Sequence, residues 1–190
     1  MNEGQVSVEG HTYPLGSPFM VIGTQNPFEY VGTYPLPENQ LDRFMLCTSI
    51  GYPKQDIEME VLASHRNGEA IDKIEPVITG EQLRQLQVKA REVLVEDSLS
   101  MYMLEIVAAT RDHPELQLGV STRGAIVFSR AVQSLALTEG RSYAIPDDVK
   151  RLAIPVLAHR VDCRGLLREG QRERAQNIIR QILDQTAVPS

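Results

Sequence analysis

The segment from Val21 to Asn26 constrains the fold more than any other part of this 190-residue chain. It is an apolar run that ends abruptly in the polar sequence Thr-Gln-Asn-Pro at residues 24–27. Such an ending is typical of a buried strand that delivers polar side chains to a ligand, because open α/β sheets bind ligands at the carboxyl ends of their strands. We therefore expect a strand over residues 19–24 with a ligand-facing tip.

A loop rich in Gly, Pro and Tyr follows this strand and leads to a short helical turn that carries Arg43 between Asp42 and Phe44. From spacing alone, such an Arg is most simply a solvated or salt-bridged surface residue. The next apolar stretch, residues 45–50, is closed by Gly-Tyr-Pro and predicts a second strand.

Three motifs of this region together resemble the MoxR family of AAA+ ATPases. They are Thr-Gln-Asn-Pro at 24–27, Gly-Thr-Tyr-Pro-Leu-Pro-Glu at 32–38 and Leu-Asp-Arg-Phe at 41–44, in the order found in the family. The resemblance implies that Asn26 is the sensor 1 residue. It also implies that Arg43 is the arginine finger, which acts in trans on the nucleotide of a neighbouring subunit.

Residues 5–14 alternate between apolar and polar side chains on both sides of Glu9-Gly10, which predicts a β-hairpin. The resemblance implies a hairpin inserted ahead of the sensor 1 strand, where relatives contact substrates or partners; a purely structural hairpin is the alternative. From Gln55 onwards the apolar residues recur with a helical period in six successive segments. Pro155 lies inside the fifth of these, so we expect a kink or an early end near Ile154.

The sequence Gly-Val-Ser-Thr-Arg-Gly-Ala at 119–125 places Ser121 as the N-cap of a helix with Arg123 in its first turn. A capped helix with an exposed Arg is the simplest interpretation, and a serine nucleophile elbow is disfavoured because no strand precedes it. In MoxR proteins this motif holds the sensor 2 Arg, which implies that Arg123 binds the ATP phosphates. Thr122 and Gly124 stand where the family usually has Pro and Ala, and we expect Gly124 to loosen the first turn.

These observations predict an α/β remnant of a AAA+ P-loop core, followed by an all-α helical lid domain. Residues 1–67 would be the C-terminal portion of the nucleotide-binding core, with the hairpin, the sensor 1 strand and the following helix and strand. Residues 68–190 would be the lid with its C-terminal helix. The sequence contains neither a Walker A motif, Gly-x-x-x-x-Gly-Lys-Ser/Thr, nor the Asp-Glu strand end of Walker B. We therefore expect a truncated chain that does not hydrolyse ATP by itself.

Composition excludes several other classes of protein. The net charge is -6 with acidic and basic residues interleaved, so binding to nucleic acid is unlikely on charge grounds. Cys47 and Cys163 are far apart and the four His are scattered, so we assign no metal site. No secretion signal and no apolar run of the roughly 18 residues that span a bilayer are present, which favours a cytoplasmic protein without a membrane segment.

The resemblance implies a parent protein that binds and hydrolyses ATP with Mg²⁺, neither of which this chain alone would hold tightly. It implies a homo-oligomeric ring of neighbouring AAA+ subunits, often a hexamer, with a von Willebrand factor A domain protein as partner. The activity would be chaperone-like remodelling or maturation of protein complexes. Two alternatives stay open: a non-catalytic binding module that acts on intact AAA+ rings, and a fragment of a magnesium-chelatase-like motor. The sequence specifies neither the client nor the ring size.

Overall fold

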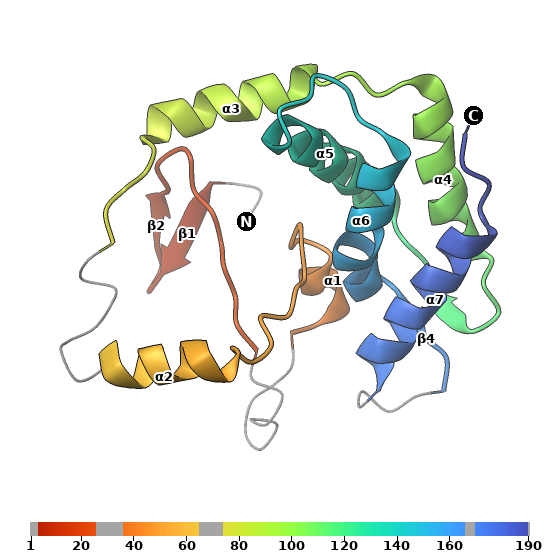
Figure 1. The fold of residues 1–190 in the computed structure, drawn as a ribbon, viewed down its shortest axis with the longest axis horizontal. Helices are drawn as coiled ribbons and strands as arrows, with labels where there is room; N and C mark the ends of the chain where they lie inside the picture. The colour runs from red at the N-terminus through yellow and green to blue at the C-terminus, as the bar shows by residue number, and fades with distance from the viewer. Residues whose placement is uncertain (1–3, 26–35, 65–73, 166–169, 190) are drawn as a thin grey trace.

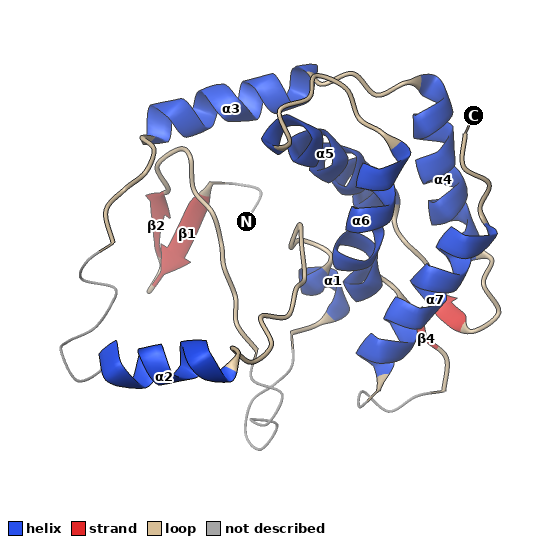
Figure 2. Cartoon of the chain, in the orientation of Figure 1, coloured by secondary structure: helices blue, strands red, loops and turns tan. Residues whose placement is uncertain are grey.

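The computed structural model describes residues 4–25, 36–64, 74–165 and 170–189. Helices α4 to α7 gather on one side, the hairpin and α2 lie apart from them, and α3 extends from the helical group (Figure 1; Figure 2 shows the same view by secondary structure). In chain order the elements are β1 Gln5–Val8, β2 His11–Pro14, α1 Glu38–Leu41, α2 Gln55–Ser64, α3 Gly80–Glu92, α4 Asp97–Arg111, β3 Leu116–Leu118, α5 Thr122–Thr138, α6 Pro146–Leu157, the 3-10 turn η3 Ala158–Arg160, β4 Asp162–Cys163 and α7 Gln171–Gln185.

The predicted hairpin is confirmed. Strand β1 pairs antiparallel with β2, with Val8 opposite His11. The two residues between them, Glu9 and Gly10, have φ angles of 50° and 80°. Positive φ at both central residues is what a two-residue type I′ turn requires, and this turn matches the twist of the strands that it joins.

The strands predicted over residues 19–24 and 45–50 are wrong. Both segments are irregular, and neither pairs with a strand in the described parts of the chain. Their apolar side chains are exposed, with 77% of Ile22 and 96% of Ile50 accessible to solvent. The apolar pattern was identified correctly, but a strand forms only where a neighbouring strand satisfies its backbone hydrogen bonds.

The hydrophobic core lies entirely in the later part of the chain, as none of the described residues before Val93 is buried. Helix α5 is at its centre and contacts α3, α4 and α6, while α7 packs on α4 and α6. The side chain of Gln133 on α5 also donates to the carbonyl of Val93 (2.9 Å) just after α3. The largest fully buried side chains are Tyr102, Phe128, Ile106, Leu157 and Ile179.

Helix α6 continues through Pro155 to Leu157, so the early end, one of the two expectations near Ile154, is wrong, and the kink stays a prediction. Val156 and Leu157 are fully buried, and their packing offsets the backbone hydrogen bond that proline cannot make. The turn η3 follows at once and contacts α1.

The short sheet formed by β3 and β4 was not predicted. Leu116 lies opposite Cys163, and a register shift separates this pair from the next. Strands of three and two residues are too short for an alternating pattern to be recognised.

Candidate functional site

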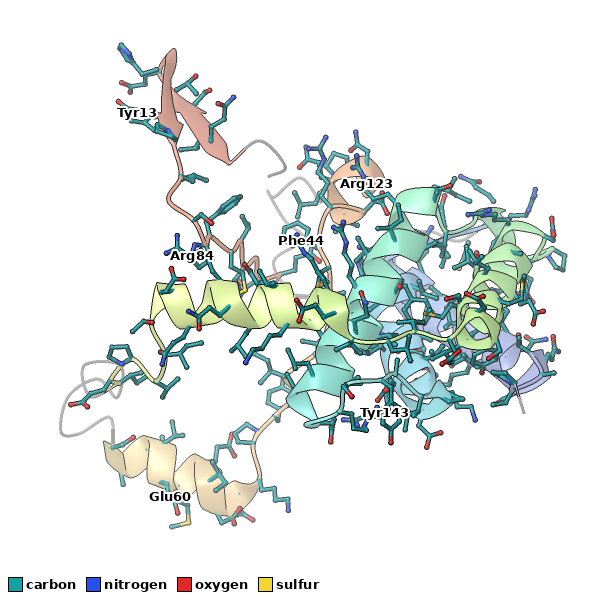
Figure 3. All side chains as sticks on the ribbon, turned by 90° about the horizontal axis from the view of Figure 1, so that it is seen from above. Tyr13, Phe44, Glu60, Arg84, Arg123 and Tyr143 are labelled. Atoms are coloured by element: carbon teal, nitrogen blue, oxygen red, sulfur yellow. The ribbon has the colours of Figure 1, made fainter. Side chains whose placement is uncertain are left out.

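Of the three predicted site residues, the structure describes Arg43 and Arg123 but not Asn26. Asn26 lies outside the described residues. Arg43 lies in the turn after α1, and Arg123 lies in the first turn of α5 (Figure 3). Both arginine side chains are exposed, and neither has a hydrogen-bond or ion-pair partner among the described residues. Within the described part of the chain, these two guanidinium groups are therefore available to bind an anion.

The start of α5 is fixed by its cap and by the loop before it. Ser121 is the predicted N-cap, and its Oγ accepts a hydrogen bond from the backbone N–H of Gly124 (3.1 Å). The hydroxyl of Thr110 on α4 accepts from the N–H of Val120 (3.0 Å), and Arg111 Nε donates to the carbonyl of Val120 (2.9 Å). These bonds hold the first turn of α5 against the end of α4.

The turn that carries Arg43 is closed by two backbone hydrogen bonds. The N–H of Arg43 donates to the carbonyl of Gln40 (3.1 Å) and that of Phe44 to the carbonyl of Leu41 (3.0 Å). The ring of Phe44 faces Gly23, where an added Cβ would lie 3.6 Å from it. The segment before Asn26 and the turn of Arg43 are therefore neighbours.

Arg160, the last residue of η3, holds this turn in place. Its side chain is completely buried, and Nε lies 3.2 Å from the Asp42 carboxylate, as a charge contact without an aligned hydrogen bond. Its Nη2 donates to the carbonyls of Asp42 (3.3 Å) and Phe44 (2.5 Å). Its Nη1 donates to the carbonyls of Met45 (3.4 Å) and Val156. A buried cation is tolerated only when it is paired and hydrogen-bonded, and these groups supply both conditions.

Asp42 joins the turn to the start of α5 as well. Both carboxylate oxygens lie 3.4 Å from Ser121 Oγ, which caps the helix of Arg123. Asp42 directly precedes Arg43, and its carboxylate contacts both Arg160, which holds the turn of Arg43, and Ser121, which caps the helix of Arg123. Sequence reasoning separated these two arginines, and the structure connects them through Asp42, Ser121 and Arg160.

His159 completes the contact with the turn. Its Nε2 lies 3.0 Å from the carbonyl oxygen of Phe44 and 2.6 Å from Arg160 Nη1, and its Nδ1 is buried without a partner in the described structure. Burial, together with the positive charge of Arg160, lowers the pKa of His159 to about 4. The ring is therefore neutral near pH 7, which avoids a second buried cation.

Gly124 allows α5 to approach Arg160 closely. A Cβ at this position would lie 2.6 Å from Val120 Cγ1 and 3.0 Å from Arg160 Cδ. The sequence suggested that Gly124 loosens the first turn of the helix. In the structure this glycine is buried, and the missing side chain makes room for Arg160.

A second buried ion pair, Arg141–Asp148, lies away from this site. Arg141 donates to both carboxylate oxygens of Asp148, at 2.8 and 2.6 Å. Burial opposes ionisation of Asp148, but its hydrogen bonds with Arg141 and the N–H of Ile145 outweigh burial and lower its pKa. Arg141 also donates to the carbonyl of Tyr143, and Figure 3 shows Tyr143 at the opposite end of α5 from Arg123.

The described ranges hold neither a metal-binding cluster nor a membrane span. Within them, no three or more His, Cys, Asp or Glu side chains come together to hold a metal ion. No helix in the same ranges is long and apolar enough to cross a bilayer.

The sequence prediction missed Asp42, His159 and Arg160 as parts of the site. His159 and Arg160 lie in an Arg-rich connection after α6, where no periodicity separates a buried arginine from an exposed one. The available signal was weak: Asp42 precedes Arg43 directly, and η3 follows a helix whose last residues are strongly apolar.

Two family profiles match the chain. "ATPase family associated with various cellular activities (AAA)" matches residues 1–46, and "AAA lid domain" matches residues 108–182. The two profiles cover the turn of Arg43 and the helix of Arg123, respectively.

Similar proteins extend the match over the chain. The uncharacterized protein YeaC of Bacillus subtilis is 46% identical over 191 residues, which cover 100% of this chain and 59% of YeaC. The chaperone MoxR1 of Mycobacterium tuberculosis is 38% identical over 170 residues, which cover 85% of this chain and 45% of MoxR1. A crystal structure of a candidate ATPase from Cytophaga hutchinsonii superposes with a TM-score of 0.85 at 32% identity, over 100% of this chain and 60% of the other. The chain thus spans about half the length of the relatives that it matches.

Proposed function

Because the chain belongs to the MoxR family of AAA ATPases, we propose that it supplies two arginines to a ring-forming ATPase that remodels protein complexes. In this proposal Arg123 contacts the phosphates of ATP bound by its own subunit. Arg43 contacts the ATP of a neighbouring subunit in the ring. Asn26 orients the attacking water or touches the γ-phosphate.

The observation that most supports this proposal is the pair of unpaired guanidinium groups on connected supports. Both Arg43 and Arg123 are exposed without an anionic partner in the described structure, and Asp42 contacts the elements that carry them. A phosphate binds strongly to free guanidinium groups, and the N-terminal end of α5 adds a favourable dipole for Arg123's ligand. Phosphoryl transfer needs such cations because negative charge develops on the transferred group.

ATP fits these residues, but they would hold only part of it. The 190-residue sequence lacks both the phosphate loop and the acidic strand end that hold the β- and γ-phosphates and Mg²⁺. When bound, Mg²⁺ neutralises phosphate charge. Hydrolysis is therefore proposed for the longer protein, with residues 1–67 as part of its nucleotide-binding core and residues 68–190 as its lid.

The partners are proposed from the family. MoxR1 carries the name chaperone, which supports remodelling or maturation of protein complexes as the activity. We propose a ring of identical subunits and a partner with a von Willebrand factor A domain. The experiment that tests the nucleotide part joins this chain to the part of YeaC that the match leaves out.

In that joined ATPase, the two arginines should fail differently when each is changed to Ala. Arg43→Ala should lower kcat by about 10³-fold or more and leave nucleotide affinity unchanged, as measured arginine fingers do. Arg123→Ala should weaken nucleotide binding. Arg130→Ala is the matched control, because Arg130 is an exposed arginine on the same helix, away from its N-terminus. Full turnover in Arg43→Ala would contradict the proposal.

Mixed rings test whether Arg43 acts in trans. Subunits with Arg43→Ala are combined with subunits that keep Arg43 and carry Asn26→Ala. Partial recovery of ATPase activity is expected, because an intact Arg43 then faces an intact site across some interfaces. No recovery, although labelled subunits exchange, would show that Arg43 does not act across an interface.

A further inference from the structure

We infer that Arg160 is a positioning residue for Arg43, and that it couples the turn of Arg43 to the helix that carries Arg123. The inference rests on the proposed function of the two arginines. Arg160 itself cannot touch a nucleotide in this conformation, because its side chain is fully buried. Its effect on turnover would pass through the backbone that it holds.

The contacts of Arg160 are concentrated on the turn of Arg43. It donates to the carbonyls of Asp42 (3.3 Å) and Phe44 (2.5 Å), the residues on either side of Arg43, and to that of Met45 (3.4 Å). A guanidinium group can hold several acceptors at once because its N–H donors lie in a rigid plane. A lysine at this position would keep the charge but offer one nitrogen at a single point.

Stability alone does not account for a guanidinium at this position. Removing a charge from water costs free energy, and apolar side chains of similar volume often replace buried ion pairs without loss of stability. Unlike an apolar side chain, Arg160 forms directional hydrogen bonds. These bonds fix three carbonyls of one turn relative to η3. The turn that presents Arg43 is thereby held in one orientation.

The same group connects this turn to the helix of Arg123. The Asp42 carboxylate contacts Arg160 Nε (3.2 Å) and the Ser121 cap of α5 (3.4 Å). The Cδ of Arg160 in turn lies against the first turn of α5, as the position of Gly124 shows. Movement of α5 in response to a nucleotide at Arg123 would therefore move the turn of Arg43, so that one subunit's ATP influences the arginine offered to the next.

Arg160→Lys in the ATPase joined with YeaC tests this role, with Arg141→Lys as the matched control. Both substitutions disrupt the pairing of a lid arginine with an aspartate, but of the two arginines only Arg160 contacts the turn of Arg43. We expect Arg160→Lys to lower kcat at least tenfold with an unchanged KM for ATP, and Arg141→Lys to change kcat by less than twofold. In an Arg43→Ala background, Arg160→Lys should cause no further loss. An equal loss of kcat in both backgrounds would overturn the inference.

Hydrogen exchange on this chain gives a readout that does not depend on activity. The amides of Arg43 and Phe44 close the turn, and their exchange should rise at least tenfold in Arg160→Lys and stay unchanged in Arg141→Lys. Unchanged exchange in Arg160→Lys would show that Arg160 does not hold the turn. If Arg43→Ala keeps full turnover, the proposed function fails, and this exchange experiment alone decides whether Arg160 holds the turn.

Discussion

The carboxylate of Asp42 lies 3.2 Å from Nε of Arg160, although 118 residues of sequence separate the two. Among the described residues, Asp42 is the only anion that the structure pairs with this buried guanidinium. The contact joins the turn of Arg43 to the lid, so its loss should affect both folding and the presentation of Arg43.

Asp42→Asn should lower the free energy of unfolding by about 3 kcal/mol, because it leaves the charge of Arg160 buried without an anion. Urea unfolding followed by far-ultraviolet circular dichroism measures the change. Glu139→Gln is the control, since it removes a pair with Arg151 whose side chains are 45% and 59% exposed. The control should cost less than about 0.5 kcal/mol. Equal losses in the two variants would show that burial adds nothing to the Asp42–Arg160 pair.

Acid should destabilise the lid through His159. Its pKa falls to about 4 in the folded chain, against 6.5 for the ordinary group, so between these values the unfolded chain binds more protons. This contribution to stability is fully present above pH 6.5 and is lost as the pH falls. By about pH 4 the loss in the free energy of unfolding is about 3 kcal/mol. Arg160, Asp42 and Arg172 are the charged groups that act on the ring.

His159→Gln isolates this effect because it removes the titrating ring and keeps a polar side chain. Unfolding free energies of both proteins, measured from pH 7 to pH 4, should show a steeper loss in the unmodified chain. Parallel curves would mean that protonation of His159 does not contribute.

Gly124→Ala should destabilise the chain by about 1–2 kcal/mol, even though Ala favours a helix more than Gly does. The added Cβ would lie 2.6 Å from Val120 Cγ1 and 3.0 Å from Arg160 Cδ. Gly16→Ala is the control, because no atom lies within 4 Å of the position that its Cβ would take. The double variant Gly124→Ala/Val120→Ala should lose less stability than the sum of the two separate losses, because the smaller side chain at position 120 relieves the clash. Strict additivity would argue against the clash.

Amide protection from hydrogen exchange should be low before Val93 and high in the helices after it. Amides of α4, α5, α6 and α7 should be protected by the core, whereas those of α2 should exchange rapidly because no residue of α2 is buried. Mass spectrometry of peptic fragments measures the contrast. Equal protection of residues 55–64 and 122–138 in a monomer would contradict this expectation.

Most helices could be predicted from the sequence, but the contact between the turn of Arg43 and the helical core could not. Helical periodicity is visible in α5 and α7 because each runs for several turns, and the Ser121 cap has a local signature. The segments over 19–24 and 45–50 were predicted as strands from apolarity alone, and strand formation depends on a partner that apolarity does not reveal.

The contact between Asp42 and Arg160 was beyond sequence reasoning for a different reason. It depends on a separation of 118 residues and on the burial of one arginine among many in the same connection. Arg43 and Arg123 could be singled out because motifs mark them. Their connection could be found only from the three-dimensional arrangement.

The position of the core at the end of the chain has a consequence for biosynthesis. Translation proceeds from the N-terminus, so the described residues from the hairpin to α3 are synthesised before Val93 and the rest of the core. Helix α7, which contributes Ile178, Ile179 and Ile182 to that core, is completed last. Exposed apolar side chains such as Met20, Ile22 and Ile50 are therefore present on the nascent chain before any core can form. Apolar surface that is exposed in this way during synthesis makes an incompletely folded chain prone to aggregate.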